Sequence, residues 1–279
     1  MRAYPGCYPC LIEQTQRTLR ITGQKPEACQ KIEAEVRAFL DRNSFQDAPA
    51  ELGRDVYRII EGFTGIRDPF QAIKEEYTRK ALALYPLMKE WVRSSEDPLF
   101  ASVKLSIAGN VIDFGLTHQF KLEEEIRNVL ESDLTVNHFS QLRDVLAAAD
   151  FILMLGDNAG ETVFDRLLIE ELAPPVKYAV RSAPIINDAV LRDAAAAGLD
   201  QVAEVFSSGS DAAGTSLTAM SEEFSEIFYS APLIISKGQG NYECLSGVER
   251  PIFYLLKAKC QVIADHLDVP RGSLLLFRE

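Results

Sequence analysis

The residues with the clearest chemical potential form the run Gly156-Asp157-Asn158-Ala159-Gly160-Glu161. This run directly follows the apolar residues 151–155 and precedes an amphipathic helical pattern, which predicts a buried strand, a loop and a helix. Ligands of open α/β sheets bind at the carboxyl ends of strands, where the next helix offers free N–H groups to an anion. Carboxylate and amide oxygens suit a hard cation such as Mg²⁺ or Mn²⁺. The alternative is an Asp-Asn turn that only caps a helix.

Polar and glycine residues follow three further predicted strands in the same way. They are Asn187 and Asp188 after the run 176–180, residues 207–215 after the run 203–206, and residues 236–241 after the run 232–235. The carboxyl ends of parallel strands meet at one edge of a sheet, so we expect these residues to converge there. Four convergent strand ends favour a binding site over unrelated turns.

Five short motifs are spread over nearly the whole chain. They are Cys7-Tyr8-Pro9-Cys10, Ala108-Gly109-Asn110-Val111-Ile112-Asp113, the run 156–161, Ile186-Asn187-Asp188 and Lys237-Gly238-Gln239-Gly240-Asn241-Tyr242-Glu243. In type and order they resemble the motifs of the damage-control phosphatase family, the group long labelled domain of unknown function 89. The resemblance implies a metal-dependent phosphatase of small phosphorylated metabolites, with a helical amino-terminal region and a Rossmann-like α/β core.

The resemblance also implies the roles of individual residues. The metal ligands of the family fall on Asp157, Asn158 and Asp188, and its phosphate-contacting lysine falls on Lys237. Asp157 is then either a nucleophile that forms an aspartyl phosphate or a ligand of the cation that activates water. The alternative for Lys237 is an exposed surface lysine next to turn glycines.

Further residues of these motifs are candidates for contacting the substrate, in addition to Asn158, Asp188 and Lys237. Backbone N–H groups around Gly160 and Gly238 are expected to face phosphate oxygens. Asn110 is expected to bind substrate, although helix capping explains it nearly as well, and Asp113 is a weaker candidate. Glu161 either stabilises the first turn of its helix through the dipole or supports the metal ligands.

Composition and charge exclude several classes of function. The chain has 279 residues, of which 47% are hydrophobic and 25% charged, and its net charge of −12 disfavours nucleic acid and anionic membranes as partners. No apolar stretch reaches the roughly 18 residues of a membrane span, and the first ten residues lack the apolar segment of a signal peptide, so a cytoplasmic protein is expected. No Walker or dinucleotide motif occurs, and no nucleotide cofactor is expected. None of the three histidines lies in a motif, which disfavours histidine-based hydrolases.

The five cysteines do not form the pattern of a disulfide framework. Cys7 and Cys10 have the spacing of half a zinc site or of a redox pair, and Cys244 and Cys260 are candidates to complete four thiolates. The alternative is a pair of ordinary reduced thiols near an amino-terminal helix. The family resemblance places the pair in a microbial-type subgroup.

The pattern of apolar residues in the sequence changes after residue 150. Periodic apolar positions predict helices from about residue 11 to 96, and further helices over residues 98–108, ending at Gly109, and over 122–130 and 139–149. After residue 150, short apolar runs alternate with helical segments, and the run 251–256 is expected to be the last strand. The expected fold class is α/β, with a Rossmann-like three-layer parallel-sheet core (residues 98–279) and an all-helical amino-terminal domain (residues 1–97).

The sequence therefore favours a phosphatase that uses Mg²⁺, Mn²⁺, Co²⁺ or Ni²⁺ and hydrolyses a phosphomonoester of a small metabolite. Sugar phosphates and phosphates of cofactor precursors are the expected substrates. Two alternatives come from other classes. One is a non-catalytic module that binds a phosphorylated metabolite, and the other is a thiol oxidoreductase that uses Cys7 and Cys10.

Overall fold

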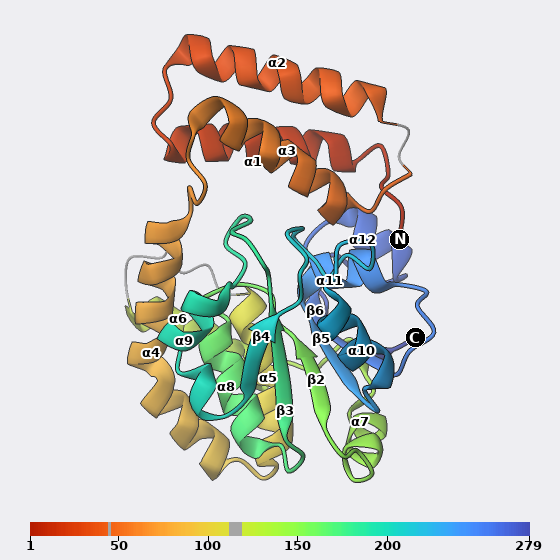
Figure 1. The fold of residues 1–279 in the computed structure, drawn as a ribbon. Coiled ribbons are helices and arrows are strands. Elements are labelled where there is room, and N and C mark those ends of the chain that lie inside the picture. Colours follow the sequence, from red (N-terminus) through yellow and green to blue (C-terminus); the bar gives the residue numbers. More distant parts are fainter. Residues whose placement is uncertain (44–45, 112–118) are drawn as a thin grey trace.

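A computed structural model describes residues 1–43, 46–111 and 119–279. Within these residues the chain forms twelve α-helices and one seven-stranded sheet (Figure 1). This confirms the predicted α/β class. The Rossmann-like character of the core and the division into domains of residues 1–97 and 98–279 stay predictions. None of the described helices combines the length and the apolar character of a membrane span.

The first 94 residues supply four helices. They are α1 (Cys7–Ile21), α2 (Pro26–Arg42), α3 (Pro49–Thr64) and α4 (Gln71–Ser94). Proline begins α2 and α3, at a position where its missing N–H has no helical partner to lose. The first three helices pack around a shared apolar core that includes Val36, Leu52 and Val56, and α4 runs along the α/β part, where it contacts α5 (Pro98–Val111) and α8 (Thr162–Glu171) (Figure 1).

The sheet has the strand order β1-β7-β6-β5-β2-β3-β4. Its strands are β1 (Val136–Asn137), β2 (Ile152–Leu155), β3 (Val176–Val180), β4 (Glu204–Ser207), β5 (Ile234–Lys237), β6 (Ile252–Lys257) and β7 (Leu274–Arg278). All neighbours pair in parallel except β6 and β7, which are antiparallel. The prediction that the run 251–256 is the last strand is therefore wrong, because β7 follows it and returns along β6.

Apolar side chains cover both faces of the sheet. Along β2, Ile152 and Met154 belong to one apolar cluster, and Leu153 and Leu155 belong to the other. The first cluster joins the sheet to α5, α7, α8 and α9, and the second joins it to α10, α11 and α12. The remaining helices are α6 (Gln119–Glu131), α7 (Phe139–Leu146), α9 (Leu191–Ala196), α10 (Glu222–Ser230), α11 (Gly238–Leu245), α12 (Gln261–His266) and the short 3₁₀ helix Leu199–Gln201.

Two glycine segments differ from expectation. Gly109 does not end α5, which continues to Val111; a Cβ at this position would lie 2.9 Å from the Phe164 ring, so glycine lets α5 and α8 approach closely. The expected glycine-rich loop after Lys237 is instead the first turn of α11. A Cβ at Gly240 would lie 1.8 Å from the carbonyl oxygen of Ala213, so glycine is required for this helix to pack there.

Candidate functional site

Three neighbouring strands end at the candidate site. The strands β5, β2 and β3 are adjacent and parallel, and Leu155 at the end of β2 pairs with Ser236 on one side and Ala179 on the other. Asp157 follows β2 by two residues, Arg181 follows β3 directly, and Lys237 is the last residue of β5. The chain behind β3 then returns to β2, where Asp188 forms a β-bridge with Asn158.

Two carboxylates and two amides interlock behind β2. The Asn110 amide donates to Asp157 Oδ2 at 2.6 Å and to Glu161 Oε2 at 2.8 Å. The Asn158 amide donates to the same two oxygens at 2.9 and 3.0 Å. Both NH₂ groups therefore face carboxylates, and the amide oxygens face the other way. The Asn110 oxygen is buried and has no hydrogen-bond partner in the described part of the chain.

Arg181 joins the two aspartates that are the candidate metal ligands. Its Nε donates to Asp188 Oδ2 at 2.8 Å, its NH1 group donates to the Thr215 hydroxyl at 3.4 Å, and its NH2 group lies 3.8 Å from Asp157 Oδ1. The side chain is 1% exposed, and NH2 has no hydrogen-bond partner among the described residues. Arg181 therefore presents one unused donor next to both aspartates.

Lys237 is fully buried and fully bonded. Its ammonium donates to Glu161 Oε1 at 2.5 Å, to Asp165 Oδ1 at 2.5 Å and to the Ser106 carbonyl at 2.9 Å. Asp165 also accepts from the hydroxyls of Ser106 and Tyr178, both at 2.7 Å. An ammonium has three donors, so a phosphate contact requires one of these bonds to be replaced. The exposed-lysine alternative is wrong, whereas the phosphate contact stays a prediction.

The buried carboxylates of the site carry more negative charge than the neighbouring cations, Arg181 and Lys237, can balance. Burial, followed by repulsion from Asp188 and Glu161, raises the pKa of Asp157 to about 8. Burial also raises the pKa of Asp188, although Arg181 opposes the rise. Burial acts in the same direction on Glu161, but the ammonium of Lys237 outweighs it and lowers that pKa. Asp157 therefore lacks the positive charge that would keep it ionised at this depth, and the pKa of Asp188 shifts in the same direction.

These residues fit a hard divalent cation. Carboxylate oxygens from Asp157 and Asp188 and amide oxygens from Asn158 and Asn110 are the donor types that Mg²⁺ and Mn²⁺ prefer, and the unpartnered Asn110 oxygen is buried beside them. Among residues 1–43, 46–111 and 119–279, no three His, Cys, Asp or Glu side chains are grouped as metal ligands. A site here would therefore depend on the amides as well as on the carboxylates.

Close packing leaves little room for a side chain at Gly160 and at Gly238. A Cβ at Gly160 would lie 3.0 Å from the Tyr77 side chain of α4. A Cβ at Gly238 would lie 2.0 Å from Asp157 Oδ2, and this glycine has φ 76°. Gly238 therefore begins α11 directly against the candidate ligand. The predicted contact of these two glycines with phosphate stays a prediction, and Asp113 lies outside the described residues.

The roles predicted for the cysteines stay predictions. All five cysteines are free thiols. Burial raises the pKa of Cys7 and of Cys10, and each is raised further by the charge of Cys260, which therefore lies near both. Cys244 packs elsewhere, because a Cβ at Gly214 would lie 2.8 Å from its sulfur. Raised thiol pKa values reduce the thiolate fraction that redox chemistry needs.

Sequence reasoning gave no role to several residues of the site, chiefly Arg181, Asp165 and Asn241, although Asn241 lies in one of the motifs. Arg181 directly follows a predicted strand, which is the signal that could have found it. Asp165 lies four residues after Glu161, so one turn of α8 separates them on the same helix face. Asn241 is buried and donates to the carbonyls of Gly156 and Lys237 at 3.0 and 2.7 Å, which ties the end of β2 to α11.

Known proteins resemble this chain over its whole length. Residues 3–275 match the family model described as the damage-control phosphatase ARMT1-like domain. A damage-control phosphatase of Pyrococcus horikoshii is 34% identical over 100% of this chain and 98% of its own. A damage-control phosphatase of Archaeoglobus fulgidus is 31% identical, over 99% and 98% respectively. The crystal structure of a DUF89 family protein from Pyrococcus horikoshii has a TM-score of 0.94 and 34% identity, and covers 100% of this chain and 99% of that one.

Proposed function

The chain belongs to the damage-control phosphatase ARMT1-like family, and we propose that it is a divalent-metal-dependent phosphatase that releases phosphate from phosphomonoesters of small metabolites. Sugar phosphates and phosphates of cofactor precursors, including damaged forms, are the proposed substrates. The substrate would bind beyond the carboxyl ends of β2, β3 and β5, as ligands do in Rossmann-like sheets.

One observation supports this proposal above the others. Asp157 and Asp188 are buried with too little positive charge, and the amides of Asn110 and Asn158 are fixed with their oxygens turned away from the carboxylates. A divalent cation held by Asp157, Asn158 and Asp188 would supply the missing charge and polarise the phosphoryl group. The cation would then attract an anionic substrate to the site, although the protein as a whole carries a net charge of −12 and repels anions.

The residues of the chain have distinct proposed tasks. The free NH2 donor of Arg181 would bind a phosphoryl oxygen next to Asp188 and stabilise the charge that develops there. Backbone N–H groups near Gly160 and Gly238 would contact the other oxygens. Asp157 remains either the nucleophile or a ligand whose position directs water to phosphorus. Each of these tasks concerns charge or orientation at the phosphoryl group.

Lys237 has a modified role in this proposal. Its ammonium holds Glu161, and Glu161 in turn accepts from the amides of Asn110 and Asn158. Lys237 would thereby orient both amide oxygens, in addition to adding positive charge beneath the phosphate. This makes it a positioning residue as well as the phosphate-contacting residue that the family resemblance implies.

Phosphate release tests the proposal. Purified protein is incubated with a panel of phosphorylated metabolites and Mg²⁺, Mn²⁺, Co²⁺ or Ni²⁺, with and without chelator, and inorganic phosphate is measured. We expect turnover that the chelator abolishes, and a loss of about 10²-fold or more in Arg181→Ala if its donor acts on the transition state. Binding of the metabolites without release of phosphate would instead support the non-catalytic binding module.

A further inference from the structure

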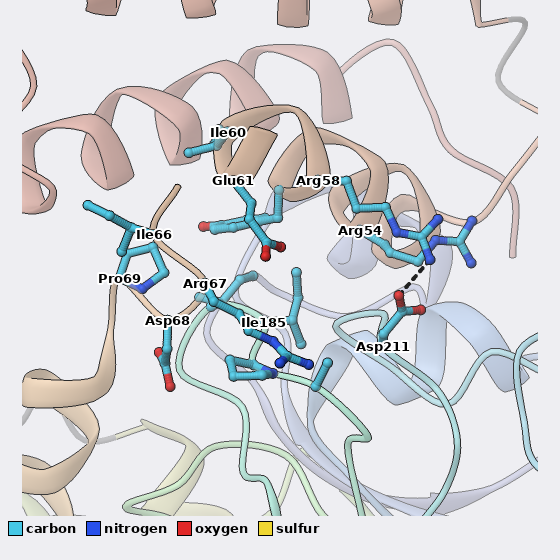
Figure 2. Close-up of a pocket in the computed structure, with 14 residues that line it drawn as sticks. Arg54, Arg58, Ile60, Glu61, Ile66, Arg67, Asp68, Pro69, Ile185 and Asp211 are labelled. Atoms are coloured by element: carbon cyan, nitrogen blue, oxygen red, sulfur yellow. Dashed lines mark hydrogen bonds and ion pairs between the residues drawn. The ribbon is translucent and has the colours of Figure 1, made fainter. Parts of the chain in front are cut away.

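A cavity lined by many charged residues lies between α3 and the loop that carries Asp188. It has a volume of about 230 Å³, and its lining includes three arginines and three carboxylates: Arg54, Arg58, Arg67, Glu61, Asp68 and Asp211 (Figure 2). Its opposite wall is the segment 183–186, which ends two residues before Asp188. The cavity is therefore a neighbour of the candidate active site, on the other side of one short loop.

Most charged groups around this cavity are already paired. Arg58 lies 2.6 Å from Asp211, the ion pair drawn in Figure 2, and Arg54 lies 3.1 Å from Asp55. Asp68 pairs with Lys74 at 2.9 Å and with Arg192. Arg67 and Glu61 differ, because neither exposed side chain has an ion-pair or hydrogen-bond partner in the described part of the chain, although both line the cavity.

A continuous lining connects Arg67 to the candidate active site. A larger cavity of about 570 Å³ is lined by Arg67 and Arg181 together, and Arg181 binds Asp188 at 2.8 Å. Arg67 thus borders both cavities, and Arg181, which also holds Asp188, lines the second. Two guanidinium groups therefore line one cavity: that of Arg181, which is paired with Asp188, and that of Arg67, which has no carboxylate partner among the described residues.

The loop that runs from residue 183 to Asp188 has a strained backbone. Ile186 has φ 45°, a conformation that β-branched residues rarely adopt. Such strain persists only where surrounding contacts fix it, and it concentrates at ligand sites. Ile185 and Ile186 form the apolar wall of the smaller cavity, and the backbone N–H of Asp188 donates to the Ile185 carbonyl at 3.0 Å. The wall of the cavity and the position of Asp188 are thereby linked.

We propose that this cavity is a subsite for a second anionic group of the substrate, with Arg67 as its free guanidinium and Arg54 and Arg58 beside it. The inference rests on the proposed function and narrows its substrates to phosphomonoesters that also carry a carboxylate or a further phosphate. A guanidinium binds either group through paired N–H donors. The phosphoryl group to be cleaved lies at Asp157 and Asp188, and the second anion lies at Arg67.

Glu61 makes the proposal sensitive to the sign of the charge. It lies on the exposed side of the same cavity, and Figure 2 shows its carboxylate directed into it. A carboxylate there opposes an anionic ligand and favours a cationic one. Neutralising Glu61 is therefore expected to tighten binding of a substrate with two anionic groups. If the cavity instead binds a cationic group, the same change should weaken binding.

Matched pairs of phosphorylated compounds test the subsite. The pairs are glucose 6-phosphate with 6-phosphogluconate, glycerol 3-phosphate with 3-phosphoglycerate, and fructose 6-phosphate with fructose 1,6-bisphosphate; the first two pairs add a carboxylate and the third adds a phosphate. Both kcat/KM and calorimetric Kd are measured for wild type, Arg67→Ala, Arg67→Lys, Glu61→Gln and the control Arg37→Ala. Arg37 is an exposed arginine of α2 whose one ion pair among the described residues is with Glu33.

We expect wild type to prefer the more anionic member of at least one pair. Arg67→Ala should reduce that preference about tenfold, as expected for losing a charged hydrogen bond, and Arg67→Lys should retain part of it. Glu61→Gln should increase the preference, and the control Arg37→Ala should leave it unchanged. Absence of a preference in all three pairs, or an unchanged preference in Arg67→Ala, overturns the subsite. Calorimetry separates the two proposals, because a preference in Kd without release of phosphate supports the subsite and contradicts the phosphatase.

Discussion

Replacing Lys237 by methionine tests whether the buried ammonium stabilises the fold as well as the site. The variant keeps the length of the side chain but leaves Glu161 and Asp165 without their cation, and all three side chains are 0% exposed. Removing one partner of a buried ion pair costs about 3–5 kcal/mol, because the remaining charge is buried without compensation. In a chain of this size that free energy corresponds to a fall of about 10 °C in melting temperature.

The pH dependence of this effect follows from the same contacts. In wild type, Lys237 lowers the pKa of Glu161, so this pair stabilises the folded state above the unfolded pKa of Glu161 and loses that effect as pH falls. In Lys237→Met the pKa values of Glu161 and Asp165 should rise, and protonation then removes the buried charge. The stability deficit of the variant should therefore be largest near pH 8 and should shrink towards pH 4.

Circular dichroism melting at several pH values measures the effect. The matched control is Lys177→Met, which removes an ion pair of 2.7 Å to Glu204 that is exposed to solvent, and which should change stability by less than about 1 kcal/mol. Adding Glu161→Gln and Asp165→Asn to Lys237→Met should restore part of the stability. A Lys237→Met protein that melts like wild type at pH 8 and only loses activity would refute this reasoning and favour a direct phosphate contact alone.

Two further predictions concern residues around the site. Gly238→Ala places a methyl group 2.0 Å from Asp157 Oδ2, so it should abolish phosphate release. The control Gly247→Ala has a similar φ of 80° and no atom within 4 Å of its Cβ, so it should cost only about 1 kcal/mol of backbone strain and keep activity. Equal activity in the two variants would contradict the contact between Gly238 and Asp157. Burial raises the pKa of Glu243 to about 7, so its folded form holds a proton that the unfolded form releases, and stability is lost as pH rises from about 4.5 through 7. Glu243→Gln should therefore be more stable than wild type at pH 8, by at most about 3 kcal/mol, and equal to it near pH 4. Melting temperatures at the two pH values check this, and a variant that is less stable at pH 8 would show that the carboxylate makes a favourable contact.

Local patterns predicted the elements whose sequence signal lies within the element itself. The apolar runs around Ile152 and Val176 are buried strands, and the polar residues that follow them lie at one edge because parallel pairing leaves no other arrangement. The strand Leu274–Arg278 was not predicted, since its pairing depends on the chain returning antiparallel along β6. The role of Gly109 was also not predicted, because it depends on Phe164, which lies far along the chain on another helix.

The site likewise combines features that the local sequence predicted with contacts that depend on distant residues. The position of Asp157 and Asn158 behind a strand was predictable, because an apolar run directly precedes them, and their role as metal ligands stays a prediction. The partners of Lys237 were not, because they lie 76 and 72 residues away, at Glu161 and Asp165. Arg181 was overlooked although it directly follows a predicted strand, because its burial and its unused donor appear only in the structure.

Titration of Mn²⁺ into chelator-treated protein tests the central claim most directly. Mn²⁺ binding is followed by electron paramagnetic resonance in wild type, Asp157→Asn and Asp188→Asn, and phosphate release is measured on the same samples, with circular dichroism to confirm folding. The account predicts about one tightly held Mn²⁺ per wild-type chain, and a loss of both Mn²⁺ binding and phosphate release in each variant, because each removes an anionic ligand. Equal Mn²⁺ binding in all three folded proteins, or phosphate release from Asp157→Asn at the wild-type rate, would contradict it.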